Sequence, residues 1–272
     1  MTSKYEPQII YGDFFQEYKN HLDPRSVDLF LSDPPWGLFQ EDSDLTGVSD
    51  PEINIEKLED VLDYLLCKNG TVLIFCDLDL LIRLKTSFNK FIFKWNYVLN
   101  KTLSVPEGKY RPIPTVEYIS VFHRAETRTS EIPFNGYESG RKGLPYQKKN
   151  YPDYQEQKTR RKIKNDFDLN KSGKRWIRQS LNMRNRCNLL KIERELGGGH
   201  PFQKSERLLR ILIKVHSKPG ALVLDGFTGS GSTLVAASKE GRKSIGLEND
   251  KRWLEVCKDR IKHETSKIEV FQ

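Results

Sequence analysis

The strongest constraint on the fold is a strand, a glycine turn and a helix that follow one another in "ALVLDGFTGSGSTLVAASKE" at residues 221–240. The run "ALVLD" is typical of a buried strand, "GFTGSG" predicts a tight loop, and the rest predicts a helix that ends at Gly241. Such a turn lets backbone amides approach a ligand and directs the positive end of a helix toward an anionic group. The next apolar run, "SIGLE", ends in Glu248, which is suited to bind the hydroxyls of a ribose.

Two phosphate-binding motifs are incomplete at this turn. A dinucleotide fingerprint requires glycine or alanine where Leu234 stands, and a Walker-type loop requires a lysine after Gly231. The turn therefore predicts a nucleoside-like cofactor that lacks a pyrophosphate. Taken alone, the turn is equally consistent with a simple connection between a strand and a helix.

Strands and helices alternate through the rest of the chain as well, and one helix is expected to stop at Asn69-Gly70. Strand, helix and buried strand in series indicate a parallel α/β sheet with right-handed crossovers. A loop is expected at 104–114, which contains three prolines. The expected strands are 8–11, 26–32, 71–76, 91–99, 116–122, 221–225 and 244–248, and the expected helices are 52–68, 78–89, 205–216 and 232–240.

The stretch "LSDPPWG" at 31–37 ends one of these strands with an acid, two prolines and a tryptophan. Proline fixes the backbone and cannot donate to a sheet ladder, so the strand has to stop here. Asp33 and Trp36 are then held at the carboxyl end of a strand, where open parallel sheets bind their ligands. A plain strand-terminating turn is the alternative interpretation.

Basic residues are concentrated in the middle of the chain. Residues 124–194 contain 19 Lys or Arg against 8 Asp or Glu, a net charge of +11, whereas the whole chain carries +8. Aromatic residues such as Phe167 and Trp176 are interleaved with these cations. The pattern predicts an inserted segment that faces phosphates and offers aromatic rings for stacking. A solvated charged surface, or a partly disordered insertion, is the alternative.

Cysteine and histidine spacing disfavours a metal site. The four cysteines contain no CxxC pair and the five histidines form no ligand spacing with them, so neither a zinc site nor a disulfide framework is expected. No apolar stretch approaches the roughly 18 residues of a membrane helix, and the N-terminus lacks the apolar core of a secretion signal. A cytoplasmic protein of a reducing compartment, with no membrane partner, is predicted.

Four motifs together resemble a known family. "DPPW" at 33–36, "HPFQK" at 200–204, "DGFTGSG" at 225–231 and "GLE" at 246–248 resemble the motifs of S-adenosylmethionine-dependent amino-methyltransferases that modify adenine N6 or cytosine N4 in DNA. Their order resembles the permuted class called beta. The resemblance implies an α/β, Rossmann-like methyltransferase fold: a central, mostly parallel seven-stranded sheet flanked by helices, with a circularly permuted motif order and an inserted basic target-recognition segment.

The same resemblance implies a division of the chain into three parts. It places the catalytic half of the methyltransferase domain at residues 1–123, the basic target-recognition insertion at 124–196, and the cofactor-binding half at 197–272. The motifs themselves cover roughly residues 9–123 and 197–261, while the middle matches only as a type of segment.

Residue roles follow from the resemblance. Asp33 and the carbonyl of Pro34 would accept hydrogen bonds from the target amino group, Pro35 would help to fix them, and Trp36 would stack on a base flipped out of the duplex. The residues expected to contact S-adenosylmethionine are Asp13, Phe202, Gln203, Lys204, Asp225, Phe227, Gly229, Gly231 and Glu248. Those expected to contact nucleic acid are Lys148, Lys149, Arg160, Arg161, Lys162, Lys174, Arg175 and Arg178.

The function implied is a site-specific DNA adenine N6-methyltransferase of a restriction-modification type, in a prokaryotic or phage-like context. Asp33 favours adenine because many cytosine enzymes have serine there, while Trp36, Ser205 and Gly226 depart from the tyrosine and prolines of many relatives. Cytosine N4 in DNA and adenine N6 in RNA are alternative targets, and an inactive nucleic-acid-binding subunit is an alternative of another class. The implied partner is double-stranded DNA, or RNA, with a second copy or a methyltransferase partner subunit as further candidates.

The basic segment makes a prediction that separates its two interpretations. Two double variants test this: uncharged residues replace Lys148 and Lys149 together, or Lys174 and Arg175 together. Each should weaken nucleic-acid binding in a salt-dependent way, because phosphate contacts release counterions. Binding titrations at several salt concentrations measure this effect. Unchanged affinity would favour the solvated surface.

Overall fold

The computed structural model describes residues 5–37, 51–101, 116–135, 141–142, 183–184, 189–192 and 203–270. The chain divides into two compact units, one formed by residues 1–135 with 187–272 and the other by residues 136–186. The expected loop at 104–114, Phe202 and the basic residues between Lys148 and Arg178 lie outside the described residues. In the second unit, β6 (Arg141–Lys142) pairs antiparallel with β7 (Met183–Arg184).

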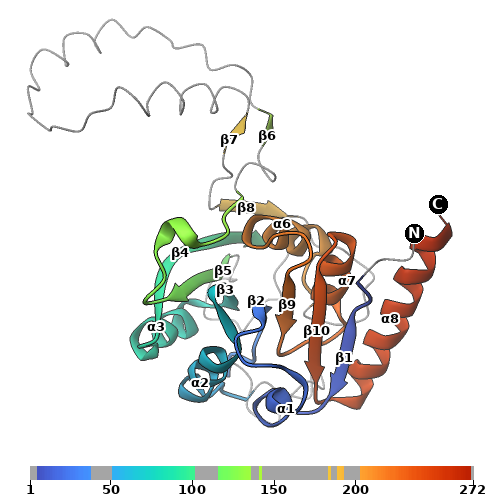
Figure 1. The fold of residues 1–272 in the computed structure, drawn as a ribbon, viewed down its shortest axis with the longest axis horizontal. Coiled ribbons are helices and arrows are strands. Elements are labelled where there is room, and N and C mark those ends of the chain that lie inside the picture. Colours follow the sequence, from blue (N-terminus) through green and yellow to red (C-terminus); the bar gives the residue numbers. More distant parts are fainter. Residues whose placement is uncertain are drawn as a thin grey trace, which may run out of the picture. The chain divides into compact units, whose positions relative to one another are not determined.

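The first unit is built on an eight-stranded sheet with the strand order β1-β10-β9-β2-β3-β5-β4-β8 (Figure 1). Strand β5 runs antiparallel to β3 and β4, and the other neighbours pair in parallel. The expected mostly parallel sheet is thus confirmed, and β8 adds a strand to the seven expected. The strands are β1 (Gln8–Tyr11), β2 (Val27–Ser32), β3 (Leu66–Cys76), β4 (Phe91–Lys101), β5 (Val116–Arg124), β8 (Leu189–Ile192), β9 (Leu222–Asp225) and β10 (Lys243–Glu248).

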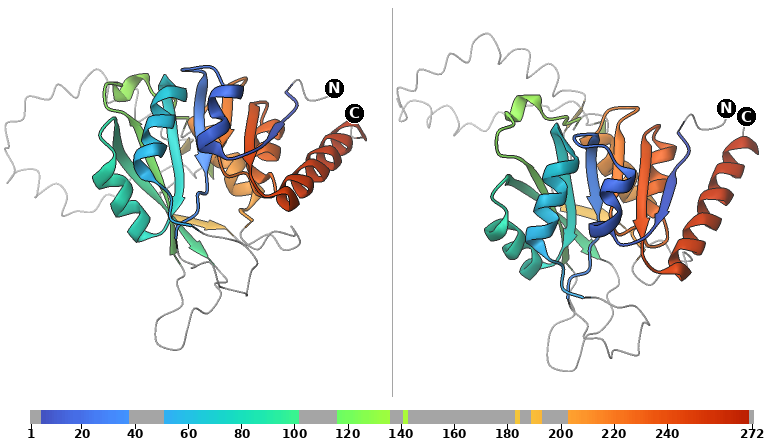
Figure 2. Two further views of the ribbon diagram at one scale, coloured as in Figure 1. Left: turned by 90° about the horizontal axis from the view of Figure 1, so that it is seen from below. Right: turned by 60° about the horizontal axis from the view of Figure 1, so that its bottom comes forward.

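Helices cover both faces of this sheet, as Figure 2 shows from two directions. Buried residues of α1, α2 and α3 form one apolar cluster with the sheet, and those of α6 and α7 form a second cluster with its other face. Burial on both faces explains why the strands read as continuous apolar runs. The helices are α1 (Phe14–His21), α2 (Ile55–Leu65), α3 (Leu78–Ser87), α6 (Glu206–His216), α7 (Ser232–Lys239) and α8 (Lys251–Val270), with a short 3-10 turn, η1 (Thr129–Glu131).

The end of α2 differs from the sequence expectation. The helix was expected to reach residue 68 and to stop at Asn69-Gly70, but it ends at Leu65, and Asn69-Gly70 lie inside β3. There β3 carries an irregularity, because Val27 pairs with Leu66 whereas Leu29 pairs with Thr71. No glycine closes this helix, so another group has to satisfy its last carbonyls.

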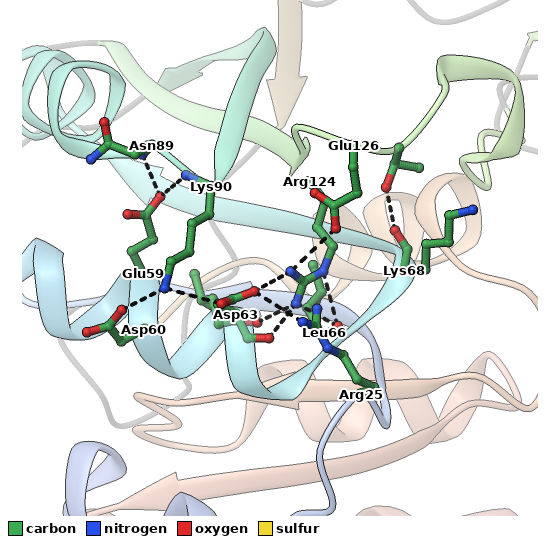
Figure 3. A network of polar contacts seen from close by, with 12 residues as sticks. Arg25, Glu59, Asp60, Asp63, Leu66, Lys68, Asn89, Lys90, Arg124 and Glu126 are labelled. Carbon is green, nitrogen blue, oxygen red and sulfur yellow. Dashed lines mark hydrogen bonds and ion pairs between the residues drawn. The ribbon is translucent and has the colours of Figure 1, made fainter.

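The Leu66 and Arg25 amides donate to the carbonyls of Leu62 and Tyr64, and the guanidinium of Arg124 (Figure 3) serves others at this end. The Arg124 side chain is 2% exposed. It donates to the backbone carbonyl of Asp63 at 2.5 Å and to that of Leu66 at 2.9 Å, and it forms an ion pair with the Asp63 carboxylate. Lys90 adds a second cation 3.2 Å from the same carboxylate. The last residue of β5 therefore fixes the junction between α2 and β3.

Removing this guanidinium should destabilise the fold. Arg124→Met keeps an apolar side chain but leaves buried carbonyls without a donor, so the free energy of unfolding should fall by about 2–3 kcal/mol. Urea denaturation measures the change. Arg25→Met is the matched control, because Arg25 pairs with the same Asp63 carboxylate at 3.4 Å but is 53% exposed; it should cost less than about 1 kcal/mol. Equal losses in the two variants would contradict a special role for Arg124.

Candidate functional site

Four acidic side chains from four strands meet at one edge of the sheet. Asp33 follows β2, Asp225 ends β9 and Glu248 ends β10, and these strands run parallel, so their carboxyl ends share an edge. Strand β5 runs the other way, so its second residue, Glu117, lies at the same edge. Ligands of open parallel sheets bind at this edge.

Asp225 joins the glycine turn to the end of β2. Its Oδ1 atom accepts hydrogen bonds from Ser32 Oγ at 2.5 Å and from the Phe227 amide at 3.1 Å. Burial raises the pKa of the Asp225 carboxyl, and these hydrogen bonds oppose that shift. The two motif-bearing loops are thus held together by a buried carboxylate.

Glu248 holds the other side of the turn. Its Oε2 atom accepts from the Gly229 amide at 2.7 Å, and its Oε1 atom accepts from the Asp250 amide at 2.9 Å. Burial raises the pKa of Glu248 while both amides oppose the shift. Each carboxylate oxygen has a second acceptor site. The side chain can therefore bind hydroxyl groups of a ligand without losing its amide contacts.

Close packing around the turn requires glycine at two positions. Gly231 precedes α7 with φ +80°, and a Cβ there would lie 2.5 Å from Cys257 Sγ. A Cβ on Gly226 would lie 2.9 Å from the Phe14 ring. This contact gives a physical reason for the departure at Gly226, where many relatives have proline, because the Phe14 ring occupies the space of a side chain.

The predicted residues Asp13 and Phe227 both contact the first turn of α1. The Asp13 side chain caps α1 by accepting from the Phe15 amide at 2.9 Å. The Phe227 ring packs edge-on against Phe14 and Phe15, with centroids 5.7 and 6.1 Å apart. Asp13 therefore has a structural role that the sequence reasoning did not assign, and its contact with a cofactor stays a prediction.

The expected acid of the "DPPW" motif forms an ion pair with Lys204. Nζ of Lys204 lies 2.9 Å from Asp33 Oδ2 and also pairs with Glu117, whose side chain is 2% exposed. The same ammonium lies 5.3 Å from the centroid of the Trp36 ring and 4.8 Å from that of Phe75. Lys204 is thus part of the site, although its expected contact with a methionine carboxylate stays a prediction.

The second oxygen of Asp33 has a different environment. Oδ1 is buried and, within the part of the chain that the structure describes, accepts no hydrogen bond. Burial raises the pKa of the carboxyl to about 6, Lys204 opposes the shift, and Glu117 and Asp225 add to it. A buried acceptor without a donor requires an explanation, and a ligand that brings an N–H group supplies one.

The remaining predicted residues that the structure describes are Pro34, Pro35, Trp36 and Gln203. Pro34 is buried, and Pro35 and Trp36 are half-buried. Gln203 Oε1 accepts from Ser230 Oγ at 3.2 Å, which joins the segment before α6 to the glycine turn.

Glu117 has no role that the sequence alone predicts. The only sequence feature that marks Glu117 is that it is a lone acid at the start of an otherwise apolar strand.

Among the described residues there is no group of three or more His, Cys, Asp and Glu that could hold a metal, and no described helix is long and apolar enough to cross a membrane.

Comparison with known sequences identifies a family. A family model described as DNA methylase, for N6/N4 methyltransferases, matches residues 27–259. Two curated relatives are type II methyltransferases. M2.LlaDCHI of Lactococcus lactis subsp. cremoris is 40% identical over 73 residues, 27% of either chain. M2.DpnII of Streptococcus pneumoniae is 40% identical over 76 residues, 28% of either chain. The match thus spans little more than a quarter of each relative's length.

Comparison with solved structures agrees in fold. M1.HpyAVI in complex with SAM has a TM-score of 0.60 at 22% identity, over 93% of this chain and 99% of that one. The cytosine-N4-specific PvuII DNA methyltransferase has a TM-score of 0.60 at 15% identity, over 97% of this chain and 92% of that one. Because the family model spans most of the sequence, the chain belongs to the DNA methylase family of N6/N4 methyltransferases.

Proposed function

We propose that the protein transfers a methyl group from S-adenosylmethionine to N6 of an adenine flipped out of double-stranded DNA. The observation that carries this proposal is the buried Oδ1 atom of Asp33 at the carboxyl end of β2, which accepts no hydrogen bond from the described residues. It lies in a motif that includes Trp36, and Ser32, the residue before it, is bonded to the glycine turn through Asp225.

The described residues fit the cofactor. Glu248 has acceptor capacity for the ribose hydroxyls, and α7 begins after Gly231, which has no side chain to cap the helix N-terminus. Four carboxylates against one ammonium give this edge a negative balance, which suits a cofactor with a sulfonium and an ammonium group. When bound, S-adenosylmethionine supplies an electrophilic methyl group.

The chain's own residues prepare the target amine. An exocyclic amine is a poor nucleophile because its lone pair is delocalised into the ring. Asp33 Oδ1 and the Pro34 carbonyl each accept a hydrogen bond from one N–H of this amine, which draws the lone pair out of conjugation. The adjacent prolines preorganise these acceptors, and Trp36 stacks on the base. Asp33 also favours adenine over cytosine in this role.

The basic segment at 124–196 supplies the DNA contacts in this proposal, apart from Arg124, whose buried guanidinium binds the end of α2. Lysine and arginine side chains neutralise phosphates. The interleaved aromatic residues stack on the flipped base or fill the space that it leaves in the duplex. The two flanking parts, 1–123 and 197–272, act as the catalytic and cofactor-binding halves.

The proposal is tested by transfer of labelled methyl groups from S-adenosylmethionine to unmethylated duplex DNA and, in parallel, to mixed RNA. Nucleoside analysis of the product should find N6-methyladenine in the DNA. N4-methylcytosine, or label only in RNA, would replace the proposed substrate. No label in any pool, despite cofactor binding, would point to a missing partner or an inactive subunit.

Asp33→Ala should separate transfer from cofactor binding. Loss of the acceptor should lower the transfer rate at least about a hundredfold, as for other preorganised polar groups at reacting centres. Calorimetry should find S-adenosylmethionine affinity nearly intact. Glu248→Ala is the converse variant and should weaken cofactor affinity first. If Asp33→Ala lost cofactor binding as well, the proposed division of labour would be wrong.

The pH dependence follows from the raised pKa of Asp33. Only the carboxylate can accept through both oxygens, and its pKa lies at about 6, so activity should be lost as pH falls through this value. We expect kcat/KM to be flat at neutral pH and to fall by about tenfold per unit well below the pKa. A profile that stays flat down to pH 5 would show that ionisation of Asp33 does not control the reaction.

A further inference from the structure

Lys204 connects two carboxylates that belong to different strands. Its ammonium contacts Asp33 Oδ2 at 2.9 Å and also pairs with Glu117. The side chains of Lys204, Asp33 and Glu117 are 16%, 25% and 2% exposed, so this charge cluster is largely shielded from water. An ion pair in such surroundings holds its geometry more firmly than one on the surface.

The fold explains why Glu117 can anchor the lysine. Glu117 lies on β5 opposite Leu99 of β4, inside the sheet, whereas Lys204 precedes α6 and Asp33 follows β2. Both of the latter residues stand outside regular elements, so their side chains depend on contacts for their orientation. Glu117 is the member of the cluster that is fixed by sheet pairing.

The contact pattern divides the work of the two Asp33 oxygens. Lys204 binds Oδ2, and Oδ1 is left buried and without a donor among the described residues. A carboxylate held at one oxygen cannot rotate freely about its Cβ–Cγ bond. The aromatic rings of Trp36 and Phe75 lie within 5.3 and 4.8 Å of the same ammonium and restrict it further.

We propose that Glu117 is a positioning residue: it holds Lys204, and Lys204 turns the Asp33 carboxylate so that Oδ1 faces the target amino group. This inference rests on the proposed function, because it assigns a role to the same acceptor. Glu117 itself does not touch substrate in this arrangement. Its effect reaches the reaction only through the ammonium of Lys204.

The charges of Lys204 and Glu117 act on the pKa of Asp33, which a purely structural contact would not change. The titratable groups that act on Asp33 are Lys204, Glu117 and Asp225. Lys204 lowers the pKa of Asp33 and Glu117 raises it. Removing each charge should therefore shift the Asp33 titration in opposite directions, downward for Glu117→Gln and upward for Lys204→Met.

The experiment combines steady-state kinetics with a titration of the ligand-free protein. For Glu117→Gln we expect kcat to fall roughly ten- to a hundredfold through misplacement of the acceptor, with KM for DNA nearly unchanged. Glu117→Asp, which keeps the charge, should recover part of the loss. Carboxyl-carbon NMR, with the Asp33 signal assigned by its loss in Asp33→Asn, should show the two opposite shifts without any cofactor or DNA.

Glu59→Gln is the matched control. Glu59 is also a buried glutamate, but its carboxylate accepts from the amides of Asn89 and Lys90 at 2.6 Å, away from this site. It should alter stability without shifting the Asp33 titration. The same control separates lost positioning from lost folding.

Two results would overturn the inference. One is native kcat and an unshifted Asp33 titration in Glu117→Gln, and the other is a shift in the same direction for Glu117→Gln and Lys204→Met. If Glu117→Gln does not fold, Glu117→Asp and Lys204→Met still give both readouts. Failure of the unaltered protein to methylate DNA would count against the proposed function alone, because the NMR titration needs no substrate.

Discussion

The parallel pairing of β2 with β9 is the contact on which the site depends. Leu29 and Phe30 pair with Val223 and Leu224, so the sheet joins segments from opposite ends of the chain. Directly beyond these pairs, Ser32 donates to Asp225 across a sequence separation of 193 residues. The acid motif and the glycine turn therefore meet only after the sheet has formed, and neither half of the chain contains the site by itself.

Charge then decides what this edge of the sheet can bind. Desolvation makes each buried carboxylate unfavourable, and the fold offsets this with one ammonium and several hydrogen-bond donors. Asp225 and Glu248 are stabilised by amides and a hydroxyl, whereas Asp33 depends on Lys204 and keeps one oxygen to which no described residue donates. The least satisfied of these acids is thus the one to which the proposed chemistry assigns the target amine.

Strand ends and turns could be predicted from the sequence because they depend on local patterns. The "DPPW" motif, the glycine turn and Glu248 were expected at strand ends, and the structure places them at one edge of the sheet. Glu117 could not be placed there, because its position depends on β5 running antiparallel. The end of α2 was predicted wrongly for a related reason: Arg124, distant in sequence, closes this helix in place of the expected Asn-Gly stop.

The contacts of Lys204 could not be predicted from the sequence either. Its motif suggested a contact with the cofactor, but the ion pairs with Asp33 and Glu117 arise from three elements that only the folded sheet brings together. The role of the basic segment was inferred from its charge and aromatic content, which indicate a class of partner without fixing any contact.

The most direct measurement of the central claim is a structure of the protein with duplex DNA and a cofactor analogue that cannot transfer its methyl group. The account predicts a flipped adenine against Trp36, with its amino group donating to Asp33 Oδ1 while Lys204 still holds Oδ2. A base whose amino group contacts other acceptors, with Asp33 remaining unpaired at Oδ1, would contradict it.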